Sequence, residues 1–157
     1  MPGSGSFVAP EPVASTRGAA GPSPAGSTTA VEPAAVEPAA RRVDKPWGHE
    51  LIWAHTDKYV GKILVIETGK RLSLQVHEQK DESILVISGR LRLHHGELGG
   101  ELGTTEMGPG DHRRIPVGMV HRFEAIERCE LIEVSTPELD DVIRIEDDFG
   151  REGTSAP

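Results

Sequence analysis

Hydrophobic residues after residue 40 come in short runs that are separated by glycine, proline and charged residues. No window long enough for a helix keeps a repeat of 3.6 residues, whereas the stretch Arg90-Leu91-Arg92-Leu93-His94 alternates strictly, as a strand does when one face is solvated. Ten short strands in about 105 residues predict an all-β sandwich or barrel. We predict strands at residues 51–54, 59–68, 71–76, 82–88, 90–95, 101–107, 112–115, 121–125, 129–135 and 141–145.

The first part of the chain has a different composition. It contains seven of the twelve prolines, a single aromatic residue, Phe7, and the pentapeptide Val-Glu-Pro-Ala-Ala, which occurs twice in succession from Val31. Such a segment cannot bury enough apolar surface to offset the entropy of the chain. We therefore predict a disordered tail over residues 1–44, one domain over residues 45–151 and a short C-terminal tail over residues 152–157.

Composition and charge exclude several classes of protein. The longest aliphatic runs, Ile63 to Ile66 and Ile84 to Ile87, are far shorter than the roughly 20 apolar residues of a membrane span, and the N-terminus lacks the apolar stretch of a secretory signal. We therefore expect a cytoplasmic protein without a membrane partner. Acidic residues outnumber basic ones by 25 to 17, and no basic stripe is present that could neutralise nucleic-acid phosphates. A small anionic molecule remains open as a partner.

Four residues have the spacing of a metal site. Gln75 and His77 lie two residues apart in a predicted strand, so their side chains leave the same face. Glu82 begins a very apolar strand after a polar turn, and a hairpin would place it beside the first two. His121 begins another strand. One amide oxygen, two imidazoles and one carboxylate suit Zn²⁺, or Mn²⁺, Fe²⁺ or Ni²⁺, with room for water or substrate.

These residues resemble the two sequence motifs of the cupins. The first motif has matching positions at Gly69, Gln75, His77, Glu82 and Gly89, with glutamine in place of the usual first histidine. The second motif has matching positions at Gly110, Pro116, Gly118, His121 and Ala125, with alanine in place of the usual asparagine. The resemblance implies an all-β cupin domain, a double-stranded β-helix also called a jelly-roll barrel.

Glutamine at the first ligand position makes the chain similar to the cupin domain of type II mannose-6-phosphate isomerases, which are often fused to mannose-1-phosphate guanylyltransferases. Three flanking segments support this likeness: Lys45-Pro46-Trp47-Gly48, Glu130-Leu131-Ile132-Glu133-Val134 and Glu146-Asp147-Asp148-Phe149-Gly150-Arg151. The resemblance implies a divalent metal ion held by Gln75, His77, Glu82 and His121. We expect zinc, with manganese, iron, nickel or cobalt as alternatives.

The resemblance also implies a sugar-phosphate substrate and an aldose–ketose isomerisation that moves a proton through an enediol. A metal ion would act as the electrophile, and Lys45, Arg71 and Arg151 are the candidates for binding the phosphate. The catalytic base is left open between a metal-bound hydroxide and a carboxylate such as Glu133. We expect Trp47 and Trp53 to fill the core rather than to stack on a sugar.

Two alternatives remain at this stage. Glu78 and Gln79 stand where the isomerases usually have two further histidines, which favours a non-catalytic metal-containing cupin that binds a sugar phosphate or a nucleotide sugar. A metal-dependent dioxygenase is disfavoured, because such cupins usually present three or four histidines to iron. The flat sheet face of a cupin also leads us to expect a homodimer.

Overall fold

The computed structural model describes residues 39–153, which form nine β-strands and no helix. Since this range contains no helix, it holds none that could cross a membrane. The chain divides into two units, residues 1–36 and residues 37–157. The nine strands all belong to the second unit. The strands are β1 (Arg41–Lys45), β2 (Gly48–His55), β3 (Val60–Ile66), β4 (Leu74–Val76), β5 (Glu82–Gly96), β6 (Gly103–Met107), β7 (His112–Ile115), β8 (Val120–Ser135) and β9 (Ile143–Glu146).

The strands β5 and β8 are long and pair antiparallel along nearly their whole length. The sequence pattern had divided each of them into two short strands, because turn residues interrupt the apolar alternation. Gly89 has a positive φ of 79°, and a side chain there would meet the carbonyl oxygen of Arg128 at 2.1 Å. The register between the two strands shifts several times around this point. Each strand therefore bends without ending, as strands with bulges do.

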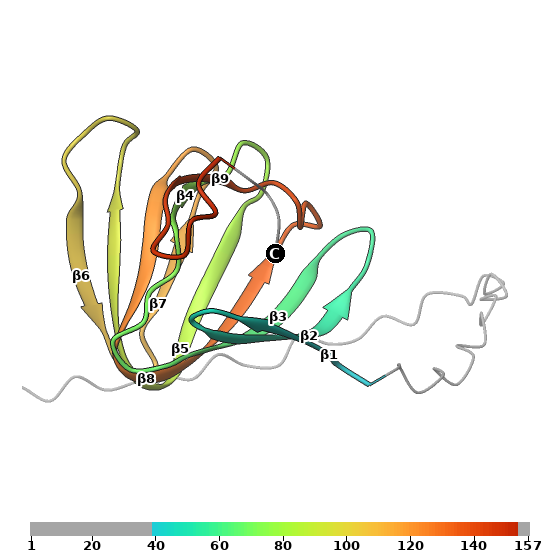
Figure 1. Ribbon diagram of the computed structural model, residues 1–157. Coiled ribbons are helices and arrows are strands. Elements are labelled where there is room, and N and C mark those ends of the chain that lie inside the picture. Colours follow the sequence, from blue (N-terminus) through green and yellow to red (C-terminus); the bar gives the residue numbers. More distant parts are fainter. Residues whose placement is uncertain (1–38, 154–157) are drawn as a thin grey trace, which may run out of the picture. The chain divides into compact units, whose positions relative to one another are not determined.

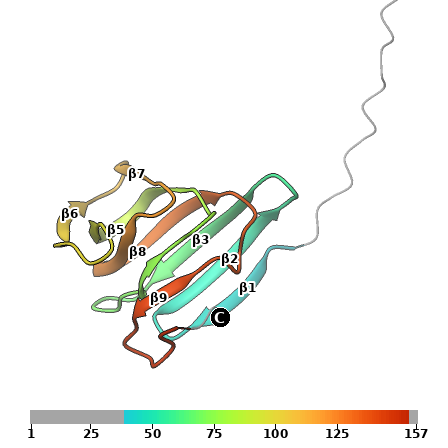
Figure 2. The ribbon, with the colours of Figure 1, turned by 90° about the horizontal axis from the view of Figure 1, so that it is seen from above.

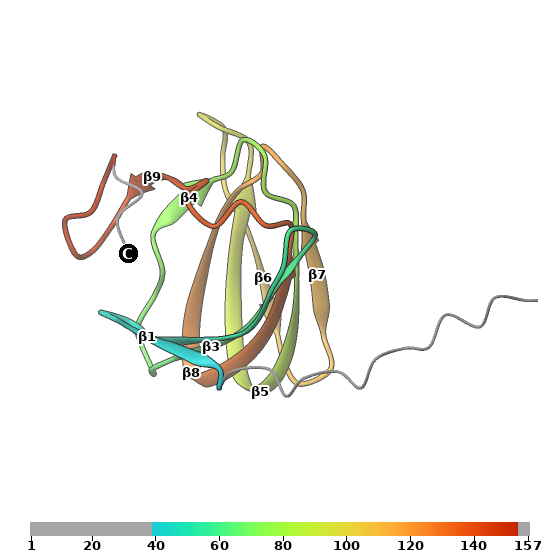
Figure 3. The ribbon, with the colours of Figure 1, turned by 90° about the vertical axis from the view of Figure 1, so that its right-hand side faces the viewer.

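Because of this bend, β5 and β8 contribute to both walls of a curled sheet. The second half of β8 pairs with β3, and β2 and β1 follow outward. The first half of β8 pairs with β4, which in turn pairs with β9. Figure 1 shows the resulting curl from the side, and Figures 2 and 3 show that β9 lies across the opening from β1 and β2. This arrangement confirms the predicted all-β fold class.

The inside of the curl holds one main hydrophobic core. Phe123, Leu91 and Leu93 are almost completely buried there, so alternate residues of β5 and β8 point inward. Trp47 is 3% exposed and belongs to this core, as predicted. The corresponding prediction for Trp53 is wrong, because Trp53 is 49% exposed.

The position of Trp53 has a local cause. The register between β2 and β3 shifts between Ile52 and Ala54, so Trp53 is the extra residue of a bulge and turns to the outer face of the sheet. Its ring lies over Gly61, where an added Cβ would come within 2.4 Å of the indole. A glycine on the neighbouring strand therefore provides the space for the exposed ring.

The ordered domain begins earlier than residue 45. Residues 41–44, which were assigned to the tail, form most of β1 and pair with β2 from Arg41 opposite Ile52 to Lys45 opposite Gly48. Backbone hydrogen bonds hold this edge strand, and its side chains are mostly exposed, so the sequence carries no apolar signal for it. The rest of the predicted N-terminal tail, up to residue 38, and residues 154–157 of the C-terminal tail lie outside the described residues.

Candidate functional site

Three of the four predicted metal ligands converge inside the curl. His77 directly follows β4, Glu82 is the first residue of β5, and His121 is the second residue of β8. The pairing of Gln75 with His121 joins β4 to β8, and this brings the ligand atoms of His77, Glu82 and His121 within 4.8 Å of one another. All three side chains are buried, with residue exposures of 2% or less.

Backbone carbonyls orient both imidazoles. Nδ1 of His121 lies 3.1 Å from the carbonyl oxygen of Met119, and Nδ1 of His77 lies against the carbonyl oxygen of Asp141. A carbonyl can only accept, so each Nδ1 carries the proton and each Nε2 keeps its lone pair. The Nε2 atoms of His121 and His77 lie 3.2 and 3.7 Å from the carboxylate oxygens of Glu82. This is the arrangement that protein metal sites use to fix the tautomer of a histidine ligand.

The charge state of these groups suits a divalent metal ion. Burial lowers the pKa of His77 to about 4, so this imidazole is neutral at pH 7. Burial alone would raise the pKa of Glu82, but the ammonium of Lys80 outweighs it and lowers that pKa, so the carboxylate is ionised. Within residues 39–153, Nε2 of His77 has no hydrogen-bond partner. A buried polar atom without a partner is costly, and a metal ion bound by His77, Glu82 and His121 would satisfy it.

Gln75 lies beside this cluster, but its amide oxygen is engaged elsewhere. The oxygen accepts a hydrogen bond of 2.8 Å from the hydroxyl of Ser73, while the amide nitrogen lies 3.3 Å from Nε2 of His121. Only the oxygen of an amide ligates a metal ion. The role of Gln75 as the fourth ligand therefore stays a prediction.

A buried lysine that the sequence reasoning did not select also belongs to the site. Lys80 was assigned to a polar turn, yet its side chain is only 7% exposed. Its ammonium lies 2.5 Å from Glu82 and 3.4 Å from Glu133. Burial would lower the pKa of Lys80, but these two carboxylates raise it overall, so Lys80 is charged. A lysine between Gln79 and Asp81 in a turn of polar residues gives no sequence signal of burial.

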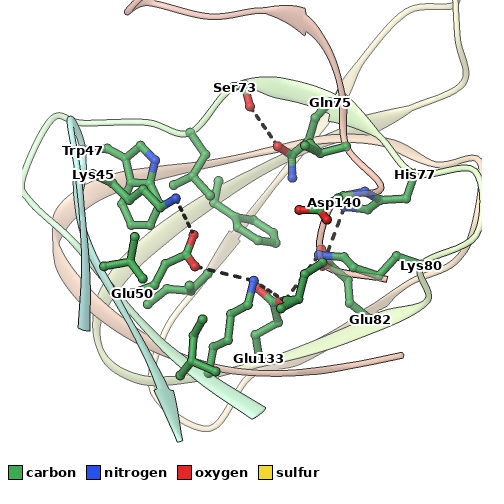
Figure 4. Close-up of a pocket in the computed structure, with 18 of the residues that line it drawn as sticks. Lys45, Trp47, Glu50, Ser73, Gln75, His77, Lys80, Glu82, Glu133 and Asp140 are labelled. Atoms are coloured by element: carbon green, nitrogen blue, oxygen red, sulfur yellow. Dashed lines mark hydrogen bonds and ion pairs between the residues drawn. The ribbon is translucent and has the colours of Figure 1, made fainter. Parts of the chain in front are cut away.

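Glu133 continues a row of alternating charges across the barrel (Figure 4). Its carboxylate lies 3.5 Å from the ammonium of Lys62, which in turn lies 3.7 Å from Glu50. Glu50 also lies 3.6 Å from the ammonium of Lys45. Burial lowers the pKa of Lys45 despite this partner. The row connects the candidate ligands to β1 at the opposite wall.

His77, Glu82 and the charged row line one cavity of about 240 Å³. Its size suits a molecule as small as a sugar phosphate. Six cationic side chains line it, namely those of Arg41, Lys45, Lys62, Lys80, Arg144 and Arg151. Two of the three predicted phosphate ligands, Lys45 and Arg151, are thus among its lining residues. The guanidinium of Arg151 is also bound by Asp147 at 3.0 Å.

Arg71 does not belong to this cavity. Its guanidinium forms two hydrogen bonds of 2.7 and 2.8 Å with the carboxylate of Asp148 on the surface of the domain. Asp148 and Glu124 raise the pKa of Arg71. The geometry therefore explains Arg71 as a member of a surface ion pair.

Comparison with solved structures supports the fold. The capsular polysaccharide assembling protein CapF of Staphylococcus aureus superposes with a TM-score of 0.59 at 18% identity, over 68% of this chain and 34% of that one. A variant of the oxalate decarboxylase OxdC of Bacillus subtilis gives 0.60 at 16% identity, over 68% of this chain and 30% of that one. Both likenesses concern the fold alone.

Comparison with curated proteins gives nearer relatives. The xanthan biosynthesis protein XanB of Xanthomonas campestris pv. campestris is 33% identical over 116 residues, which are 71% of this chain and 24% of that protein. The mannose-1-phosphate guanylyltransferase ManC of Salmonella typhimurium is also 33% identical over 116 residues, and 23% of it is covered. The chain thus spans about a quarter of the length of these relatives. The family model described as mannose-6-phosphate isomerase C-terminal matches residues 34–147, and the chain belongs to this family of cupin domains.

Proposed function

We propose that the protein is a metal-dependent sugar-phosphate isomerase that interconverts mannose 6-phosphate and fructose 6-phosphate. The observation that carries this proposal is the meeting of His77, Glu82 and His121 at one end of a cavity whose other wall carries several cationic side chains. Such a cavity offers an electrophilic centre for one end of a sugar phosphate and an anion site for the other. Membership of the mannose-6-phosphate isomerase C-terminal family supports this choice of substrate.

The candidate ligands set the charge of the metal centre. A bound divalent ion would act as a Lewis acid toward the oxygens on C1 and C2 of the sugar. His77 and His121 are neutral donors, and the ammonium of Lys80 offsets the charge of Glu82. The centre would therefore keep a positive charge, which favours the oxygens of an enediolate over those of the substrate. We expect zinc, and we propose Gln75 as a fourth ligand through its amide oxygen.

The phosphate would bind at the wall that is formed by β1, β3 and the end of the described chain. Lys45 and Arg151 are the predicted phosphate ligands, and Lys62 and Arg144 line the same cavity. A guanidinium can bind two phosphate oxygens at once. Arg151 would exchange part of its contact with Asp147 for such a pair when the phosphate enters.

A carboxylate in the cavity would move the proton between C1 and C2. We propose Glu133, which lies between the metal centre and the phosphate wall and is 4% exposed. The ammonium groups of Lys80 and Lys62, at 3.4 and 3.5 Å, hold this carboxylate in place. Neutralising it in a Glu133→Gln variant should lower kcat by about 10²- to 10⁴-fold.

The assay for the proposal uses protein that has been loaded with zinc. Mannose 6-phosphate is added, and fructose 6-phosphate is measured through a coupled reaction, with His121→Ala as the inactive control. Metal content is measured by elemental analysis in parallel, for wild type, Gln75→Ala and His121→Ala. Failure to form a ketose phosphate from any aldose 6-phosphate would refute the proposed activity, and full metal content in both variants would refute the proposed site.

One observation favours a second candidate, a metal-containing cupin that binds a sugar phosphate or a nucleotide sugar without changing it. Three carboxylates of the cavity, Glu50, Glu82 and Glu133, all have ammonium partners, and these partners occupy oxygen lone pairs that a base would need to accept a substrate proton. Calorimetry separates the two candidates. Binding of mannose 6-phosphate without turnover would support the second one.

A further inference from the structure

The turn that joins two of the candidate metal ligands is held by hydrogen bonds from a segment that lies more than 50 residues further along the chain. His77 and Glu82 are separated by residues 78–81, which lie between β4 and β5 and belong to neither strand. The segment that follows β8 supplies hydrogen-bond acceptors for this turn. Thr136 accepts from the backbone N–H of Asp81 through its hydroxyl at 3.1 Å and donates its own N–H to the carbonyl of Asp81 at 3.0 Å.

Asp141 accepts the other three backbone N–H groups of the turn. One carboxylate oxygen accepts from Glu78 at 3.1 Å, and the other accepts from Gln79 and Lys80 at 2.7 Å each. Hydrogen bonds from N–H groups to an ionised carboxylate are among the stronger ones in proteins. These bonds lower the pKa of Asp141 although burial opposes them, so the acceptor stays ionised.

The same residue also holds the imidazole of His77. The backbone carbonyl of Asp141 accepts the Nδ1 proton of His77. The side chain and the main chain of one residue therefore act together. The carboxylate ties residue 141 to the turn, and the carbonyl of the tied residue fixes the tautomer and the orientation of the histidine.

We propose that Asp141 is the positioning residue of the metal centre. It acts through His77, whose Nδ1 proton its carbonyl accepts, and through the turn that carries Lys80 into contact with Glu82. This inference rests on the proposed metal site but not on the proposed isomerase activity. Because His77 and Glu82 lie at the two ends of one clamped turn, loosening the turn should displace both ligands together.

The test measures metal binding rather than catalysis. Full-length protein is freed of metal with a chelator, and the dissociation constants of Zn²⁺ and Co²⁺ are determined for wild type, Asp141→Ala, Asp141→Asn and the control Asp57→Ala. The visible spectrum of the Co²⁺ form reports the ligand geometry, and thermal unfolding of each metal-free protein reports stability. Asp57 is an exposed acid between β2 and β3 whose carboxylate pairs with Lys58 on the surface.

We expect Asp141→Ala to weaken binding of both ions by about 10- to 100-fold, as is typical when the outer-shell support of a metal-ligating histidine is disrupted, because the carbonyl that orients His77 is no longer tied to the turn. The cobalt spectrum should change as well. Asp141→Asn keeps one acceptor oxygen, so its affinity should lie between those of wild type and Asp141→Ala. Asp57→Ala should bind within about twofold of wild type, since this side chain lies on the surface and pairs only with Lys58 among the ion pairs of the described residues.

Two results would overturn the inference. The first is a fall in melting temperature of Asp141→Ala with an unchanged affinity and an unchanged cobalt spectrum, because a purely structural role predicts that pattern. If Asp141→Ala does not fold, an Asp141→Asn variant that binds both ions with wild-type affinity would overturn the inference instead. A wild-type protein that binds neither ion would refute the metal site and the inference with it, whereas metal binding without isomerase activity would leave the inference intact.

Discussion

Lys80 offers the sharpest test of how charge is balanced in the metal centre. Replacing it by methionine keeps most of the buried side-chain volume and removes the ammonium that lies 2.5 Å from Glu82 and 3.4 Å from Glu133. Lys62 still contacts Glu133 in the variant. Glu82 loses its ammonium and is left with the two histidines as neighbours.

The size of the effect follows from the distances and the burial. Two unit charges about 3.4 Å apart attract each other by about 5 kcal/mol at an effective dielectric constant of about 20, and the cost of desolvating the lysine offsets part of this. Loss of one partner from a buried ion pair typically costs about 3–5 kcal/mol. We therefore expect the free energy of unfolding of the metal-free protein to fall by about 3 kcal/mol, a large share of the roughly 5–15 kcal/mol of an ordinary domain.

Metal binding should respond in the opposite direction. Without the ammonium, both oxygens of Glu82 are available and no nearby cation repels the metal ion. We expect zinc to bind about tenfold more tightly to Lys80→Met, which corresponds to about 1.4 kcal/mol. Saturating zinc should accordingly restore part of the lost stability, because a ligand that binds only the folded state stabilises it.

The assay is urea unfolding, followed by tryptophan fluorescence, with chelator and with excess zinc. The matched control is Lys58→Met, since Lys58 lies 3.4 Å from Asp57 at a side-chain exposure of 79%, and a surface pair at that distance contributes little. Equal stability of metal-free Lys80→Met and wild type would refute the argument about the buried pair. Weaker zinc binding by the variant would refute the assignment of Lys80 as a competitor for Glu82.

Further predictions concern pH and the bend of the long strands. Because the pKa of His77 is lowered to about 4 from an ordinary 6.5, the unfolded chain takes up the proton first, so the metal-free protein should lose about 3 kcal/mol as the pH falls from about 6.5 to 4. Over this pH range the urea midpoint should change less with pH in His77→Gln than in wild type. An equal pH dependence in both proteins would contradict the assignment of this loss of stability to His77. Gly89→Ala should lower the melting temperature more than Gly69→Ala, since both glycines have positive φ but only Gly89 has a backbone oxygen within 4 Å of the added Cβ. An equal fall in melting temperature in both variants would show that the positive φ alone determines the cost of adding a Cβ.

Much of the fold could be predicted because its signals are local. Alternation of apolar and polar residues marks strands, and glycine with turn residues marks their ends, so the all-β class and most strand positions followed from neighbours in the sequence. The merging of the short predicted strands into β5 and β8 could not be predicted in this way. Pairing between the two strands continues through Gly89, and such pairing is a long-range property.

The candidate ligands could also be predicted from the sequence. His77, Glu82 and His121 are histidines and a carboxylate at strand ends with motif spacing, and the structure brings their ligand atoms together. Lys80 and Asp141 were missed as members of the site for one physical reason. Each makes a contact in the site with a group that lies more than 50 residues away in the chain, Glu133 for Lys80 and the turn around Lys80 for Asp141.

The sequence by itself therefore determined the class of fold, the family motifs and the residue types that can hold a divalent metal ion, since these depend on local periodicity and spacing. Only the tertiary structure decided which charged side chains face the cavity. It separated Arg71, which pairs with Asp148 on the surface, from Lys80, which is buried against Glu82. Both are cations beside turns in the sequence, and burial by distant strands is what makes one of them part of the site.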